Sequence, residues 1–258
     1  MAVKLYGVSV SHPSHAARAM LELKGIEYEL VNMPTGVHAI LLRGAGFRGR
    51  TVPALKIDGR RIQGSKEISR ALDEIQPAPP LFPADRRAAV EEAEAWGERE
   101  FQPLPRRFFR WGLSNVPELR MWAAKNVIKS RAPGATAAAI LPMARWFARL
   151  SRADDDYTRE GVAKLPGALD HVDELIAEGT IGREDEPTAA DYQIASTVAV
   201  LRGFADVKEL VEDRPAAELA GRLFPRRLAG LPPFLPEEWL EPVRTVSPPS
   251  ANPPSAIQ

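Results

Sequence analysis

The sequence predicts a mixed α/β domain over residues 1–78 followed by an all-helical domain over residues 86–232. Two observations predict this. Short apolar runs alternate with helical patterns in the first 75 residues, whereas only helical patterns remain after the proline-rich segment QPAPPLFPAD. The change of pattern places a linker at residues 79–85 and predicts no core strand after it.

The N-terminal elements follow the order β-α-β-α-β-β-α. Residues 3–10 and 26–31 are apolar runs of strand length, with a helical pattern ending at Gly25 between them. A weaker helical segment, GVHAILLRGAG, precedes the hairpin ALKIDGRRIQ, and a second helix opens at Ser65. Parallel crossovers followed by a hairpin are typical of a small sheet covered by helices.

Helical patterns then cover residues 84–100, 136–150 and 159–178. Thr188 and Asp191 form a capping signal for a further helix, since a threonine followed three residues later by an acid satisfies free amides at a helix start. From residue 233 to 258 the chain is rich in proline and has little to bury, so we expect a disordered tail.

Composition excludes several function classes. Lys plus Arg equals Asp plus Glu at 34 each, so the overall charge does not point to nucleic acid or an anionic membrane. The absence of cysteine excludes disulfides and protein thiolates, so any sulfur chemistry comes from a bound small molecule. The first residues lack a signal-peptide pattern, and we expect a cytoplasmic protein.

A proline stands where the third strand should begin, although it cannot donate to a strand ladder. The order Val52-Pro53-Ala54-Leu55, hairpin and Ser65 resembles the glutathione transferases, and the resemblance covers almost the whole chain. It implies a thioredoxin-like N-terminal domain in which Pro53 is cis and the backbone of Val52 pairs with the cysteinyl part of glutathione. The alternative is a trans proline on an edge strand.

The same resemblance assigns the start of the next helix to the γ-glutamyl group of glutathione. Ser65 matches the serine that holds the carboxylate, with help from the helix dipole. Gly64 replaces the acid that pairs with the ammonium, so the substitution Gly64→Glu is expected to tighten glutathione binding. Ser65 could alternatively serve only as the cap of its helix.

The segment Ser11-His12-Pro13-Ser14 lies where serine-type transferases carry the hydroxyl that touches the thiol. The likeness is nearest to the theta class, and it places Ser11 at the active hydroxyl, His38 at the glycyl end of glutathione, and Thr51 where lysine is common. Ser14 and Tyr6 are alternatives for the hydroxyl, and His12 is a possible secondary residue. Tyr6 falls one residue early and fits a strand side chain better.

Three other interpretations are set aside. His12 and His15 have no neighbouring acid, so a metal site is disfavoured, and the glycine-flanked elbow of serine hydrolases is missing around Ser11. The basic stretch from residue 106 to 131 carries aromatics, but zero net charge favours buried aromatics and solvated arginines. In the family this region lines the electrophile pocket, which makes three residues candidates: Phe108, Phe109 and Trp111.

The sequence therefore predicts a glutathione transferase-like homodimer that uses glutathione as co-substrate, no metal, and an apolar electrophile or a peroxide, with a role in detoxification. No nucleic-acid or membrane partner is expected. Two alternatives remain: a non-catalytic binding protein that kept the fold, and a transferase that uses another thiol such as mycothiol.

Overall fold

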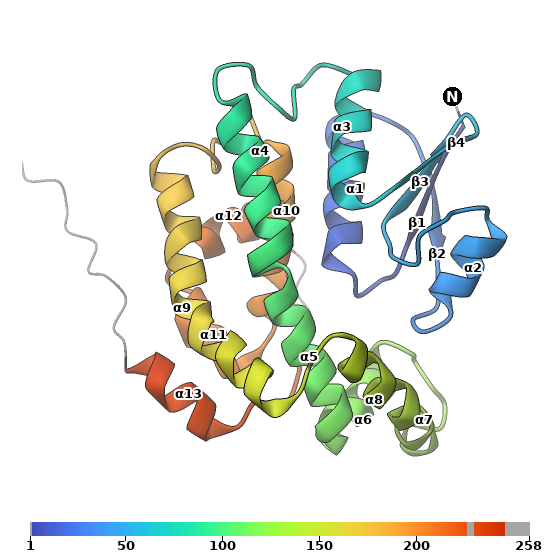
Figure 1. Cartoon of the computed structure of the whole chain (residues 1–258), viewed down its shortest axis with the longest axis vertical. Helices are drawn as coiled ribbons and strands as arrows, with labels where there is room; N and C mark the ends of the chain where they lie inside the picture. The colour runs from blue at the N-terminus through green and yellow to red at the C-terminus, as the bar shows by residue number, and fades with distance from the viewer. Residues whose placement is uncertain (1, 226–229, 246–258) are drawn as a thin grey trace, which may run out of the picture.

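A computed structural model describes residues 2–225 and 230–245 of the chain. A four-stranded sheet with helices on both faces stands beside a larger group of helices (Figure 1). Within the described ranges every strand lies between Val3 and Gln63. The predicted fold class, an α/β thioredoxin-like domain followed by helices, is confirmed.

The N-terminal elements appear in the predicted order. They are β1 (Val3–Gly7), α1 (His12–Leu23), β2 (Glu29–Asn32), α2 (His38–Gly44), β3 (Ala54–Ile57), β4 (Arg60–Gln63) and α3 (Ser65–Ile75). The sheet order is β2-β1-β3-β4, with β1 parallel to β2 and antiparallel to β3. Helix α2 covers one face, and α1 and α3 cover the face toward the other helices (Figure 1).

Two strands are shorter than the sequence predicted. β1 ends at Gly7, because the amide of Ser11 donates to the carbonyl of Val8 at 2.9 Å and turns the chain into α1. β2 begins only at Glu29, because the amide of Ile26 donates to the carbonyl of Leu21 at 3.0 Å and closes the end of α1. Local hydrogen bonds of turns therefore exclude from the strands several residues that the apolar pattern had assigned to them.

The C-terminal part consists of helices in the described ranges. They are α4 (Arg87–Trp96), the π-helical turn η1 (Gly97–Phe101), α5 (Pro103–Asn115), α6 (Pro117–Asn126), α7 (Pro133–Ala139), α8 (Leu141–Leu150), α9 (Asp155–Ala177), α10 (Ala189–Leu201), the 3-10 turn η2 (Ala205–Val207), α11 (Lys208–Val211), α12 (Pro215–Leu223) and α13 (Glu237–Arg244). The single helix predicted over residues 136–150 is divided at Ile140, since Pro142 lacks the amide that would continue it. Five of these helices have no counterpart in the sequence analysis: α5, α6, α11, α12 and α13.

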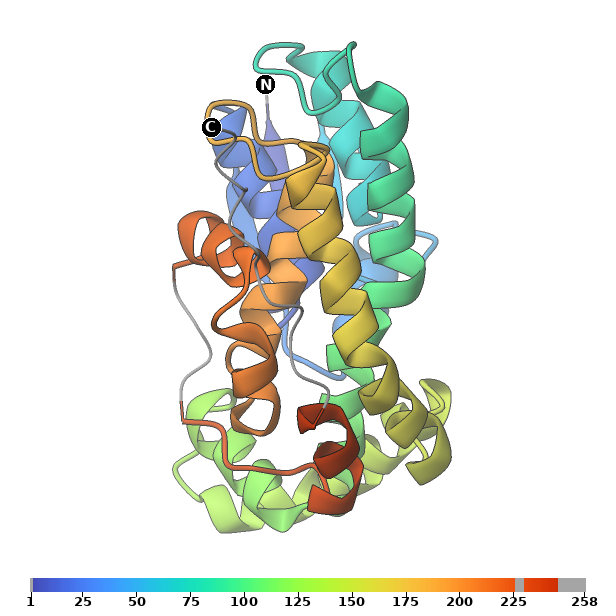
Figure 2. The ribbon, with the colours of Figure 1, turned by 90° about the vertical axis from the view of Figure 1, so that its left-hand side faces the viewer.

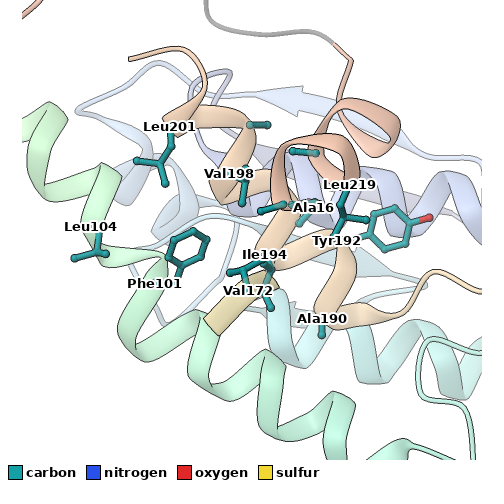
Figure 3. Packing of buried hydrophobic residues seen from close by; sticks show 14 of the residues in the cluster. Ala16, Phe101, Leu104, Val172, Ala190, Tyr192, Ile194, Val198, Leu201 and Leu219 are labelled. Atoms are coloured by element: carbon teal, nitrogen blue, oxygen red, sulfur yellow. The ribbon is translucent and has the colours of Figure 1, made fainter. Parts of the chain in front are cut away.

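Helix α10 lies at the centre of the molecule. Its predicted capping box is present: Thr188 accepts from the amide of Asp191, and the Asp191 carboxylate accepts from the amide of Thr188 at 2.7 Å. The side chains around it come from α1, η1, α9 and α12 (Figure 3). Figure 2 shows α9, α10 and α12 in front of the N-terminal domain.

Two apolar clusters stabilise the fold. The larger one runs without interruption from the α1 and α3 face of the sheet into the helices around α10. The smaller one lies under α2 and contains Val8, Met33, Leu42, Phe47 and Ala54. Because the larger cluster spans both parts of the chain, the two parts bury their apolar surface together.

The prediction of a disordered tail from residue 233 is wrong over residues 233–245. Helix α13 buries Trp239, Leu240 and Val243, and the amide of Phe234 donates to Asp206 Oδ2 at 3.0 Å. The indole of Trp239 lies against that of Trp111, with ring centroids 4.9 Å apart. The high proline content of this segment led the sequence analysis to miss α13. Residues 246–258 lie outside the described part of the chain.

None of the described helices is both long enough and apolar enough to cross a lipid bilayer.

Replacing Trp239 with alanine tests whether α13 is part of the folded unit. Trp239 is 7% exposed and Trp146 is 54% exposed, so Trp146→Ala is a matched control. We expect Trp239→Ala to lower the free energy of unfolding by about 3–5 kcal/mol and Trp146→Ala by less than about 1 kcal/mol. Urea unfolding followed by circular dichroism measures both. Equal losses in the two variants would show that α13 contributes no stability.

Candidate functional site

The topology gathers the N-terminal candidates at one edge of the sheet. β1 and β2 are parallel and both end there, β3 begins there, and β4 returns to it with Gln63 opposite Ala54. The chain segments that leave or enter the strands at this edge carry the candidates: Ser11, His38, Thr51, Val52, Pro53, Gly64 and Ser65. Residues from four separate segments therefore face a common region.

Ser11 occupies the N-cap position of α1, with φ −90° and ψ 106°. Its hydroxyl makes no capping bond and is not hydrogen-bonded to any other described residue. The side chain is half-buried at the end of a helix that carries partial positive charge. This arrangement leaves a hydroxyl free to bind an anion.

The two alternatives to Ser11 are placed differently. Ser14 is 5% exposed and packs against Gly7. Tyr6 lies within β1, and its ring meets that of Phe47 edge-on at 5.2 Å in the cluster under α2. Both side chains belong to the packing of the domain, and Ser11 stays the better candidate.

Val52 presents unused backbone groups. The Val52-Pro53 peptide bond is cis, as expected. The carbonyl of Pro53 accepts from the amide of Gly64 at 3.0 Å, and that of Thr51 accepts from Gln63 Nε2 at 2.8 Å. Between them, the N–H and C=O of Val52 are not hydrogen-bonded within the described residues. An extended peptide could pair with them as an added strand does.

Gly64 is required as glycine. Its φ of 105° and ψ of 143° belong to a region that residues with a side chain rarely adopt. A Cβ atom at this position would also collide with the carboxylate of Glu67, which folds back over the start of α3. The expectation that Gly64→Glu tightens glutathione binding is therefore disfavoured, because the substitution strains the backbone.

Ser65 belongs to a buried polar network. Its hydroxyl donates to Gln193 Oε1 of α10 at 3.0 Å, and Gln193 Nε2 donates to Glu94 Oε1. Ser69 Oγ also donates to Glu94 Oε1 at 2.8 Å, and Arg70 Nη1 donates to Glu94 Oε2. Burial raises the pKa of Glu94, although Arg70 and Ser69 oppose this. Ser65 therefore makes no capping bond to its own helix, and its hydroxyl links α3 to α10 and, through Gln193, to α4. This linking role was missed by sequence reasoning.

The two histidines after the first strand diverge. His15 Nε2 lies 2.8 Å from the carbonyl oxygen of Ser9, whereas His12 is 6% exposed and packs toward α5. Burial lowers the pKa of His12 well below its ordinary value, and the charge of Arg106 adds to this. In the described ranges, groups of three or more His, Cys, Asp or Glu suited to a metal ion are absent.

His38 stands at the start of α2 and has a similar environment. Burial lowers its pKa, and the charge of Arg110 adds to the effect. The expectation that the arginines of the basic stretch are solvated is therefore wrong for Arg106 and Arg110, which are half-buried and lie near the two histidines.

The aromatic residues expected to line an electrophile pocket pack against other helices instead. Phe108 is fully buried next to Gly161, which is incompatible with lining an open pocket. Trp111 donates from Nε1 to Asp155 Oδ1 at 2.8 Å, and Phe109 stacks on Phe204 with centroids 6.3 Å apart. These rings hold α5 to the other helices, because they occupy the face of α5 that is turned to the core.

A surface hollow of about 220 Å³ lies between α4, η1 and α9. Its walls include Trp96, Lys164 and His171, and it contains none of the candidate residues. The candidate site at the edge of the sheet is therefore separate from this hollow.

Comparison with known sequences agrees with this geometry. Residues 5–80 match the family model for the glutathione S-transferase N-terminal domain. The chain is 36% identical over 110 residues to maleylacetoacetate isomerase of Mus musculus, a match that covers 39% of this chain and 49% of the relative. The chain thus spans about half the length of the curated relatives that it matches.

Solved structures extend the likeness to the whole fold. A glutathione S-transferase of Ceriporiopsis subvermispora in complex with glutathione has a TM-score of 0.59 at 17% identity, covering 86% of this chain and 96% of that one. A maleylacetoacetate isomerase of Anaeromyxobacter dehalogenans 2CP-1 with bound GSH has a TM-score of 0.51 at 20% identity, covering 86% and 89%. The chain has the glutathione S-transferase fold.

The raised pKa of Glu94 predicts a pH-dependent stability. The native state binds this proton more tightly than the unfolded state, so its contribution is greatest below the ordinary value of 4.5 and falls as pH rises through the folded pKa. We expect the free energy of unfolding of wild type, relative to Glu94→Gln, to decrease between pH 4 and pH 8. Urea unfolding of both proteins across this range measures the difference. A difference that grows with pH would mean that Arg70 outweighs burial.

Proposed function

We propose that the chain is a glutathione-dependent transferase that stabilises the thiolate of bound glutathione and transfers it to an electrophile or reduces a peroxide with it. The observation that carries this proposal is the free hydroxyl of Ser11 at the start of α1, on the same sheet edge as the unbonded backbone of Val52. A thiol peptide bound to the backbone of Val52 would place its sulfur near the hydroxyl of Ser11.

Each part of the thiol has a matching group in the chain. The N–H and C=O of Val52 suit the cysteinyl peptide groups, and the amides at the start of α3, with Ser65, suit a carboxylate. His38 is assigned to the glycyl end, and Thr51 and His12 are further candidates for contacts with the thiol. The side chain of Ser65 can accept but does not donate freely, since its proton is used by Gln193.

Ser11 acts on the thiol by favouring its charged form. A hydroxyl that donates to a thiolate, together with the positive end of α1, lowers the pKa of the bound thiol. The thiolate then attacks the electrophile and forms a carbon–sulfur bond, while a leaving group such as chloride departs with the electrons of the bond that breaks. With a peroxide it attacks oxygen and breaks the O–O bond, which gives a sulfenic acid and an alkoxide that takes up a proton to become an alcohol. A second thiol then condenses with the sulfenic acid to give a disulfide and water.

By its resemblance to the glutathione transferases, the protein is further proposed to be a cytoplasmic homodimer with a role in detoxification, most similar to the theta class. Two alternatives stay open: a binding protein that kept the fold without catalysis, and a transferase whose thiol is not glutathione. A transferase that uses another thiol is favoured by Gly64, because glycine stands where the family has an acid that pairs with the ammonium of glutathione.

A second candidate reaction is glutathione-dependent cis–trans isomerisation. The similarity to maleylacetoacetate isomerase of Mus musculus favours it. In such a reaction the thiolate adds to a double bond, the adduct rotates about the resulting single bond, and the thiolate leaves again. The same Ser11 hydroxyl would stabilise the thiolate before attack and after departure.

Ser11→Ala tests the proposal. Losing a hydrogen bond to a charged group, roughly 1.5–3 kcal/mol, should raise the bound thiol's pKa by about one to two units. We expect conjugation of glutathione to 1-chloro-2,4-dinitrobenzene at neutral pH to fall about tenfold to a hundredfold and to recover partly as pH rises. Glutathione affinity by calorimetry should change only a few-fold.

Ser14→Ala is the matched control and should retain most of the rate. If Ser14→Ala is the damaging change, the assignment of Ser11 is wrong. If the wild type gives no heat with millimolar glutathione and no thiolate absorbance, glutathione is not the ligand, and the same titration with mycothiol then separates the two alternatives.

A further inference from the structure

Helix α5 presents two arginines to the N-terminal domain. Arg106 and Arg110 are one helical turn apart, and we call them the α5 arginine pair. The charge of Arg106 acts on His12, which follows Ser11 directly, and that of Arg110 acts on His38 at the start of α2. The pair thus lies between the helical domain and the proposed thiol site.

Neither arginine forms an ion pair with a described residue. Among the described residues no carboxylate lies within 4.0 Å of either guanidinium. Arg106 Nη2 donates to Gln102 Oε1 at 2.8 Å, and Arg110 Nη1 donates to Ser151 Oγ, both neutral acceptors. Glu98 acts on Arg106 only from a longer distance. Most of the N–H groups of the pair are therefore unused within the described chain.

This arrangement is unfavourable without an anion. Burial lowers the pKa of Arg110 to about 10, and the charge of Arg106 adds to this. Like charges four residues apart on a helix repel each other. A half-buried pair of guanidiniums that is neither paired nor fully solvated gains from any anion that reaches it.

The surrounding polar atoms point the same way. His12 Nε2 and Gln102 Nε2 are buried and make no hydrogen bond, although their residues are only 6% and 5% exposed. His38 Nδ1 is also buried without a partner. Of these atoms, Gln102 Nε2 is a donor, and a buried amide N–H without an acceptor is costly, so it favours an oxygen-rich ligand beside the pair.

The pair is held in place from the helical side. The guanidinium of Arg110 lies over the ring of Phe147 at 5.5 Å and is bonded to Ser151 at the end of α8. Met143 of the same helix reaches Gly36 in the loop before α2, so α8 closes this side against the N-terminal domain. The donors are thus fixed before any ligand arrives, which limits the entropy lost on binding.

We propose that the α5 arginine pair binds a carboxylate carried by the second substrate, so that the electrophile is an organic acid and not a purely apolar molecule. This inference rests on the proposed function, since it places the acid next to the thiolate at Ser11. Arginine is suited to it because its planar N–H groups match the two oxygens of a carboxylate. The apolar electrophile expected from the sequence is replaced by an anionic one.

The first test compares an acid with its ester in the reaction. With 4-chloro-3-nitrobenzoate or its methyl ester, the thiolate bonds to the ring carbon and chloride leaves with the electrons of the broken carbon–chlorine bond. We expect the ratio of kcat/KM, acid over ester, to fall at least about tenfold in Arg106→Gln and Arg110→Gln. Arg99→Gln, which removes an exposed arginine of η1, should leave the ratio unchanged.

The second test needs no thiol. Calorimetry with unreactive 3-nitrobenzoate and its methyl ester should show that the acid binds at least about tenfold more tightly in wild type and Arg99→Gln. This preference should shrink in Arg110→Lys, which keeps the charge but loses the planar N–H pair, and vanish in Arg110→Gln. Circular dichroism confirms that each variant is folded.

The outcomes separate the two proposals. If the acid binds selectively but no thiol is consumed, the arginine pair is a carboxylate site and the transferase proposal fails. If acid and ester are conjugated and bound alike, or if the preference survives in a folded Arg106→Gln, Arg110→Gln double variant, the carboxylate site is overturned while the transferase proposal stands.

Discussion

The burial of α10 is the constraint on which the rest of the structure depends. Its residues from Ala189 to Ala199, and Leu201, are all buried. The first N–H groups of a helix in this position cannot donate hydrogen bonds to water, so they need acceptors within the protein. The amide of Ala189 donates to the carbonyl of Leu81 at 3.0 Å, and that of Asp191 donates to Thr188 Oγ1 at 3.4 Å. The Asp191 carboxylate in turn accepts from the Thr188 and Gly182 amides, at 2.7 and 2.6 Å, and fixes the chain before the helix.

The same helix ties the two parts of the site together. Gln193, two residues after Asp191, bonds to Ser65 at the start of α3 and to the buried Glu94 of α4. The helix that is proposed to hold the thiol carboxylate therefore cannot move independently of the helical domain. The N-terminal domain contributes the Ser11 hydroxyl and the Val52 backbone, and the helical domain contributes the support and the arginines facing them.

Charge shows the limit of arguments from composition. The chain has 34 basic and 34 acidic residues, and this balance excluded polyanionic partners in the sequence analysis. A balance over the whole chain leaves room for a local surplus, because burial brings particular side chains together and keeps counter-charges out. Arg106 and Arg110 form such a surplus, and the proposed carboxylate would offset one of its two positive charges.

The sequence by itself determined those features whose physics is local: the order of strands and helices up to Ser65 and the capping box of α10. Each depends on residues a few positions apart, since turns and caps act over that range. The cis peptide bond before Pro53 was implied by the family resemblance and not by the residues around it. Only the tertiary structure decided the partner of Ser65, which is 128 positions away, the direction of the α5 arginines and the docking of Trp239 on Trp111. These depend on how buried surfaces meet across the fold, and a helical pattern shows which residues share a face but not what that face will contact.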